Sequence, residues 1–239
     1  MDIEIEEKMN WTRFRRNLNQ TYKYDEIWED AIMLFDSRLK RKFFDPIQLI
    51  IDKKTLKGEG FAIVTVQCAL IEMLASFRQG KIFNHDNSDG LQKYEYKENM
   101  KMFTSLLRTA SIFKDNFWQL NNKNKPVIDK PYNSKDFYKN VRCGLMHEAR
   151  TKENWHINAT PLTISVKTEK KFIVTEEGKF KIHRTILHYR LLDYLSEYEN
   201  ELRKDSKESE ILRKFFARKL DHLFDFKADA NYNWWSVTE

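Results

Sequence analysis

The stretch Phe61-Ala62-Ile63-Val64-Thr65-Val66-Gln67-Cys68-Ala69-Leu70-Ile71-Glu72-Met73-Leu74-Ala75-Ser76-Phe77-Arg78-Gln79 is the most hydrophobic part of this chain of 239 residues. It is apolar around much of a helical circumference, which predicts a helix at the centre of the fold. Four polar residues interrupt it: Thr65, Gln67, Glu72 and Ser76. A core helix is therefore expected rather than a membrane span, and Gly80 is well placed to end it.

Further helices are expected on both sides of this stretch. Apolar residues recur with the 3.6-residue period over 24–44, 98–113, 133–149, 186–204 and 209–224. Asp45-Pro46 is expected to break the first of these and to open a short helix that ends at Ile51. The aromatic tail, Tyr232 to Trp235, either docks on the rest of the protein or stays mobile.

Between the helices ending at 149 and starting at 186, the pattern becomes that of β-strands. Ile, Val, Thr and Phe alternate in part over 155–157, 162–167, 171–175 and 179–183, with Glu176-Glu177-Gly178 as a hairpin turn. The sequence predicts a mainly α fold: a helical bundle of one domain, 1–239. It carries a small antiparallel β insert at about 155–183, followed by C-terminal helices at about 184–224.

The composition favours a cytoplasmic protein without a membrane segment. Only 6 Gly and 4 Pro argue against a β-rich fold, and Cys68 and Cys143, far apart, are expected to be reduced thiols. The start of the chain does not have the pattern of a secretory signal. The net charge of +6 permits a polyanionic partner, although 36 acidic residues are mixed among 42 basic ones.

One segment carries a chemical pattern: Arg142-Cys143-Gly144-Leu145-Met146-His147. On a helix, Phe137, Val141, Leu145 and Ala149 form an apolar stripe, and Arg142 and His147 lie outside it. Five residues separate these two by about 140° around the axis and about 7.5 Å along it, so one chain holds them poorly around a single atom. Two such helices across a two-fold axis could present both pairs to one cleft.

These side chains suit RNA cleavage by attack of the 2′-hydroxyl. Histidine titrates near neutrality and can act as a general acid or base. Arginine is permanently charged and its planar fork matches two phosphate oxygens. The end of the helix and Glu148 beside His147 are expected to favour the imidazolium form. An alternative is that His147 caps helix carbonyls and Arg142 pairs with a carboxylate.

Residues 137–152, Phe-Tyr-Lys-Asn-Val-Arg-Cys-Gly-Leu-Met-His-Glu-Ala-Arg-Thr-Lys, resemble the Arg-x4-6-His helix of the HEPN superfamily. The resemblance implies an α-helical bundle, a homodimer with a composite site, and metal-independent endoribonuclease activity in toxin–antitoxin or anti-phage systems. By position it assigns Arg142 and His147 as catalytic. Many active members place a polar residue directly after the arginine, whereas this chain has Cys143, so an inactive HEPN-like module is a second interpretation.

Other residues could support the site. Glu72, a carboxylate within the apolar helix, needs a partner if buried and could pair with Arg142. Asn140, Arg150 and Lys152 could bind the phosphates of RNA, although a surface asparagine and a solvated helix end explain them as well. No metal or cofactor is expected, since His183 and His188 lack the i, i+4 spacing of a helical metal pair.

Three functions remain open at this stage. The first is a metal-independent endoribonuclease that acts on single-stranded RNA or tRNA loops, with an antitoxin or another defence protein as partner. The second is an inactive module for dimerisation, RNA binding or regulation. The third is a metal-dependent DNA nuclease, which only Glu-x-Lys triplets in the sequence indicate.

Overall fold

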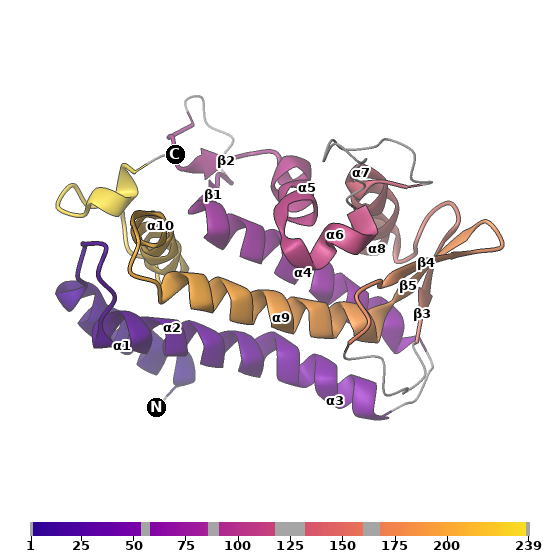
Figure 1. Ribbon diagram of the computed structural model, residues 1–239, viewed down its shortest axis with the longest axis horizontal. Helices are drawn as coiled ribbons and strands as arrows, with labels where there is room; N and C mark the ends of the chain where they lie inside the picture. Colours follow the sequence, from indigo (N-terminus) through magenta and orange to yellow (C-terminus); the bar gives the residue numbers. More distant parts are fainter. Residues whose placement is uncertain (1, 54–57, 86–90, 118–131, 160–167, 238–239) are drawn as a thin grey trace. The chain divides into compact units, whose positions relative to one another are not determined.

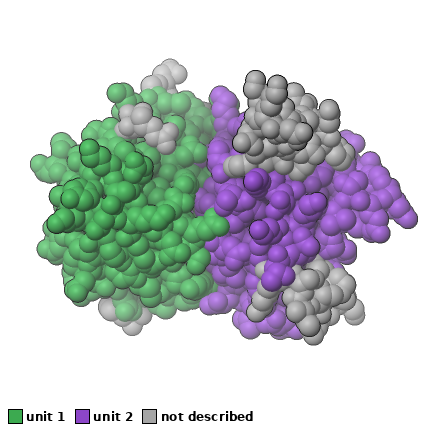
Figure 2. All heavy atoms as spheres, viewed as in Figure 1, with its two compact units in different colours: residues 1–42, 74–98, 195–239 green, residues 43–73, 99–194 purple. Residues whose placement is uncertain are grey.

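The computed structural model describes residues 2–53, 58–85, 91–117, 132–159 and 168–237. These residues divide into two compact units, coloured separately in Figure 2. Unit 1 consists of residues 1–42, 74–98 and 195–239, and unit 2 of residues 43–73 and 99–194.

Unit 1 is built mainly from helices (Figure 1), and aromatic side chains pack between them. Its elements are α1 (Ile3–Asn17), α2 (Glu26–Leu39), the end of α4 (Glu59–Gln79), β1 (Ile82–Phe83), β2 (Glu95–Tyr96), the end of α9 (Arg184–Leu202), α10 (Lys207–Leu223) and the 3-10 turn η5 (Asn233–Trp235). The Phe35 ring of α2 lies 4.5 Å from that of Phe77 and 5.3 Å from that of Phe216, between ring centroids. The sequence did not indicate the short parallel pair β1–β2.

The carboxylate of Asp221 on α10 ties both ends of the chain into unit 1. It is fully buried and accepts hydrogen bonds from Trp11 Nε1 at 3.0 Å and Arg15 Nε at 2.6 Å. The indole N–H groups of Trp234 and Trp235 also donate to it, both at 3.1 Å. The aromatic tail is therefore docked, because its two indoles help to satisfy a buried charge.

We expect Asp221→Asn to lower the free energy of unfolding by about 3–5 kcal/mol, because the buried Arg15 would keep only the more distant carboxylate of Asp229, at 3.9 Å, as a partner. Urea unfolding followed by tryptophan fluorescence measures this. The control is Asp225→Asn: Asp225 is exposed and pairs with Lys8 at 3.3 Å, so its loss should cost less than about 1 kcal/mol. Equal effects of the two variants would contradict this role of Asp221.

Unit 2 contains the remaining helices and the larger sheet. Its elements are the end of the π-helical turn η1 (Lys40–Phe44), α3 (Asp45–Lys53), the first part of α4, α5 (Asn99–Thr109), η2 (Ser111–Phe113), α6 (Lys114–Phe117), α7 (Ser134–Phe137), η3 (Tyr138–Arg142), α8 (Cys143–Glu148), β3 (Trp155–Asn158), β4 (Ile173–Glu176), β5 (Lys179–His183) and the start of α9. Phe103, Phe137, Trp155 and Phe172 are buried and share ring contacts in its core.

The expected helix break at Asp45-Pro46 is wrong: the chain is helical from Glu26 to Lys53. Pro46 has no N–H to donate to the carbonyl of Lys42, and its ring crowds that position in an α-helix. The π-helical turn η1 lies directly before it. A π turn changes the hydrogen-bond spacing locally, so the proline is accommodated without a break.

The β insert lies between the motif helix and α9, and its three described strands are in the order β3-β5-β4. As expected, β4 and β5 form an antiparallel hairpin, and Glu177 and Gly178 both have positive φ at its turn (50° and 73°). The insert is not wholly antiparallel, because β3 pairs with β5 in parallel. A parallel pair requires a long connection, which the 20 residues from 159 to 178 provide. The strand expected at 162–167 falls outside the described residues.

The expected mainly helical fold with a small β insert is confirmed. Helix α4 spans Glu59–Gln79, and Gly80 follows it with φ +57°. Of the described helices, α4 alone is long and apolar enough to cross a bilayer. In its most apolar window 56% of the residues are buried inside the protein, as is typical of a core helix.

Candidate functional site

The motif segment folds as one helical run in unit 2 (Figure 1). Asn133 caps α7 and forms a capping box with Asp136. The run continues through η3, a π-helical turn that ends at Arg142, into α8. Phe137, Val141 and Leu145 are buried, as their spacing predicts. Ala149, the fourth residue of the expected stripe, is instead exposed and ends the helix in the left-handed conformation (φ 51°).

After Ala149 the chain folds back across the motif helix. The amide of Arg150 donates to the carbonyl of Gly144 at 3.3 Å, and that of Lys152 donates to the carbonyl of Asn140 at 2.9 Å. A Cβ on Gly144 would lie 2.4 Å from the main-chain oxygen of Arg150. Glycine is therefore required here for close backbone approach, and a glycine inside a helical pattern is the sequence signal that indicates it.

Gly144→Ala should lower the free energy of unfolding by about 1–3 kcal/mol, because the return segment would have to move away from the helix. Ala149→Gly should raise it, by up to about 1 kcal/mol, since glycine adopts the left-handed conformation without strain. Urea unfolding curves measure both changes. If Gly144→Ala were neutral, the close backbone approach would not be important for stability.

Arg142 is held by an ion pair with Glu72 of α4. Its Nη2 lies 3.1 Å from Glu72 Oε2, and the two side chains are 15% and 17% exposed. The guanidinium lies 5.4 Å from the centroid of the Tyr138 ring. Burial acts to lower the pKa of Arg142, but the charges of Glu72 and Tyr138 and the Glu72 hydrogen bond raise it overall. The expected Glu72–Arg142 pair is confirmed, and Tyr138, four residues before Arg142, is a neighbour that the sequence analysis missed.

Two free thiols lie near this pair. Cys68 is fully buried, and burial raises the pKa of its thiol to about 12, so it stays a neutral thiol. Cys143 is half-buried. Burial raises the pKa of the Tyr138 hydroxyl, and a hydrogen bond with Cys143 adds to this effect. The Cys143 thiol therefore interacts with the polar Tyr138 hydroxyl, although a thiol is only weakly polar.

His147 is exposed in the last turn of α8. Within the part of the chain that the structure describes, its side chain has no hydrogen bond or ion pair. Glu148, expected to act on His147, instead pairs with Arg150 at 3.2 Å and with Lys152. The Lys152 hydrogen bond, with that of Arg150, lowers the pKa of Glu148. His147 is thus presented to solvent, and the carboxylate next to it in the sequence is already paired with Arg150 and Lys152.

The chain does not bring all the expected site residues together. Arg142 points its guanidinium to Glu72, whereas His147 is exposed, in agreement with their opposed directions on a helix. Arg150 and Lys152 meet at Glu148, where either cation could exchange its partner for a phosphate. Asn140 is 8% exposed, which favours a role in packing over the expected contact with phosphate.

Metal ligands do not cluster in the described ranges: no group of three His, Cys, Asp or Glu residues there could hold an ion. His188 is instead a core residue, 1% exposed, with its ring 5.8 Å from that of Phe44. Its Nδ1 has no hydrogen-bond partner. Burial lowers the pKa of His188 from 6.5 to about 4, against the opposing effect of Asp52 and Asp45.

This shift predicts how stability depends on pH. Because the folded pKa lies below the unfolded one, the unfolded chain takes up the proton first, and stability is lost as the pH falls from 6.5 to about 4. The contribution of His188 to this loss is about 3 kcal/mol. His188→Phe should remove it, as measured by urea unfolding at pH 7 and pH 4.5. His156→Asn, at an exposed position on β3, should keep the difference of the wild type, and an unchanged difference in His188→Phe would contradict the assignment.

No protein-family model, no curated protein and no solved structure matches this chain. The resemblance to the HEPN superfamily therefore depends on residues 137–152 and on the geometry around them.

Proposed function

We propose that the protein is a metal-independent endoribonuclease of HEPN type that acts as a homodimer on single-stranded RNA or tRNA loops. The observation that carries the proposal is the state of the two motif residues. Arg142 is oriented by Glu72 and Tyr138, and His147 is exposed at the end of the same helical run.

The chemistry needs a proton donor and a fixed positive charge. The 2′-hydroxyl gives its proton to water, its oxygen forms a bond to phosphorus, the bond from phosphorus to the 5′-oxygen breaks, and a 2′,3′-cyclic phosphate remains. His147 would supply the proton that the leaving 5′-oxygen takes up. Arg142 would offset the extra negative charge of the phosphorane. An oriented guanidinium suits this role, because it does not have to be reordered as the charge develops.

A homodimer resolves the separation of the two residues within one chain. One chain presents His147 to solvent and holds Arg142 half-buried, so a composite site would combine the motif helices of two protomers. Unpaired RNA is the favoured substrate because in-line attack requires a flexible backbone. Arg150 and Lys152 would bind flanking phosphates by exchange from Glu148. A role in toxin–antitoxin or anti-phage defence, with a cognate partner, is what the resemblance implies.

A second candidate is an inactive HEPN-like module for dimerisation, RNA binding or regulation. Two observations favour it. Cys143 takes the place of a polar residue, and the ion pair with Glu72 gives Arg142 a structural role. The two candidates differ in whether any RNA product is formed.

RNA cleavage in the presence of EDTA distinguishes these candidates. Wild type should cut total RNA or tRNA and leave 2′,3′-cyclic phosphate ends, and His147→Ala should be slower by about 10²–10⁴-fold through the loss of general acid catalysis. Since His147 is exposed, the variant should fold as the wild type does. Glu72→Gln should slow cleavage as well, because Arg142 would lose its orienting charge.

The matched control is Met146→Ala, at an exposed position on the same turn (51%), which should keep the wild-type rate. Cleavage that His147→Ala leaves unchanged would refute the assignment. Absence of product from total RNA and tRNA would favour the inactive module. Cleavage of DNA only with added magnesium or manganese would favour a metal-dependent nuclease.

A further inference from the structure

The charges of α1 separate into two groups according to the face on which they lie. Those that face the rest of unit 1 are paired: Glu4 with Lys42, Glu7 with Arg38 and Arg41, Lys8 with Asp225, and Arg15 with Asp221. Trp11 and Phe14 are buried between them. This inner face thus meets the ordinary requirement that charges near a core find partners.

The opposite face of α1 is unpartnered. Ile5, Met9, Thr12 and Arg16 follow one another at spacings of four, three and four residues, so they lie on one side of the helix. Ile5 is 54% and Met9 58% exposed. We call the surface made by Ile5, Glu6, Met9, Thr12, Arg13 and Arg16 the α1 outer face.

The charges of the α1 outer face are segregated along the helix. Glu6 lies toward the N-terminus of α1, and Arg13 and Arg16 lie toward its C-terminus. Within the described residues, none of these three charges has an ion-pair partner; Arg13 lies over the Phe14 ring at 5.0 Å. Of the two apolar residues, Ile5 lies at the acidic end and Met9 in the middle of this surface.

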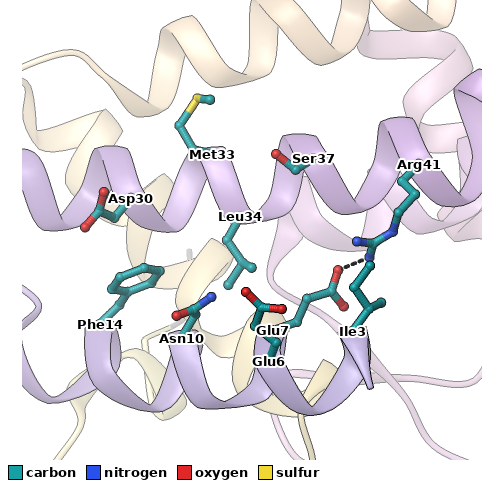
Figure 3. A pocket seen from close by; sticks show the side chains of 10 residues that line it. All are labelled: Ile3, Glu6, Glu7, Asn10, Phe14, Asp30, Met33, Leu34, Ser37 and Arg41. Atoms are coloured by element: carbon teal, nitrogen blue, oxygen red, sulfur yellow. Dashed lines mark hydrogen bonds and ion pairs between the residues drawn. The ribbon is translucent and has the colours of Figure 1, made fainter. Parts of the chain in front are cut away.

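Two hollows border the α1 outer face. Met9, Thr12, Arg13, Arg16 and Asn17 line a hollow of about 350 Å³ at the basic end. Glu6 borders a groove of about 400 Å³ between α1 and α2 (Figure 3). Asp30 lines the α2 side of this groove beside Phe14, toward the basic end of α1, and it also has no ion pair to another described residue. The acidic end of the α1 outer face therefore presents one unpaired carboxylate, that of Glu6, and the basic end two unpaired guanidinium groups.

We propose that the α1 outer face binds the same face of a second copy of this chain, with the two α1 helices antiparallel. Met9 then meets Met9 at the two-fold axis, and Ile5 of each protomer enters the hollow at the basic end of the other. Glu6 of each protomer faces Arg13 and Arg16 of the partner. An isologous interface needs a surface that is complementary to itself, and a charge gradient centred on an apolar residue fulfils this condition.

This surface belongs to unit 1, whereas Arg142 and His147 belong to unit 2. The self-association is therefore a second interface, separate from the dimer of motif helices proposed above, and a chain that uses both associates beyond a dimer. Charge reversals on the α1 outer face should weaken this association and leave RNA cleavage unchanged, whereas His147→Ala should slow cleavage and leave the association unchanged.

Sedimentation equilibrium of the full chain tests the proposal with two charge reversals of opposite sign. Glu6→Arg makes the α1 outer face wholly basic, and Arg13→Glu with Arg16→Glu makes it wholly acidic. Each variant should weaken self-association by at least about 10-fold in dissociation constant, through facing like charges. An equimolar mixture of the two should form a heterodimer, because all facing charges are then opposite. The combined variant with all three changes should dimerise again.

The control is Lys23→Glu, a reversal at an exposed position of unit 1 outside this surface, which should associate as the wild type does. Circular dichroism checks that each variant is folded, and recovery by mixing excludes misfolding as the cause of a loss. A wild type that is monomeric at every concentration would overturn the proposal. So would a dimer that the reversals leave unchanged, or a monomer that binds anionic lipid vesicles through this face.

Discussion

A carboxylate placed in the most apolar helix of the protein determines how the motif helix is held. Glu72 is 17% exposed, and its charge needs a partner, which Arg142 provides at 3.1 Å. Removal of one member of such a pair is costly, because the other charge is left without compensation in a poorly solvated place. The ion pair therefore orients the guanidinium and joins the motif helix to α4 within unit 2. In the proposed function, the restraint that stabilises the fold would also hold the arginine ready for a phosphate.

The packing around the motif helix imposes a second constraint. The return segment crosses Gly144 at a distance that allows no Cβ and donates its amides to carbonyls of the helix. His147 lies between this crossing and the end of α8, so its exposure follows from where the chain turns back. The arginine is thus fixed by electrostatics and the histidine is placed by the backbone.

In unit 1 the same principle acts through Asp221. One buried carboxylate accepts hydrogen bonds from α1 and from the C-terminal turn η5, so that elements far apart in the chain converge on α10. The charges on the inner face of α1 all have ion-pair partners in unit 1. Within the described residues, the charges of the α1 outer face have none. That contrast on a single helix is the reason to assign the outer face to another molecule.

Helical and β-strand periods are local properties of the sequence, and they were sufficient to predict the mainly helical fold, α4 as a core helix and the β4–β5 hairpin. A carboxylate in an apolar helix indicated that Glu72 needs a partner, and Arg142 was one candidate, which the structure confirms. The position of each element in three dimensions depends on residues far apart in the chain, so the remaining features were decided by the tertiary structure. Pro46 lies within a continuous helix because a π turn precedes it. Strand β3 is parallel to β5. Asn140 is buried, although the sequence also allowed a surface position. The docking of Trp234 and Trp235 likewise depends on Asp221, a partner that no local pattern reveals. Periodicity reports which face of an element avoids water, whereas the partner of each buried polar group is chosen by the packing of the whole unit.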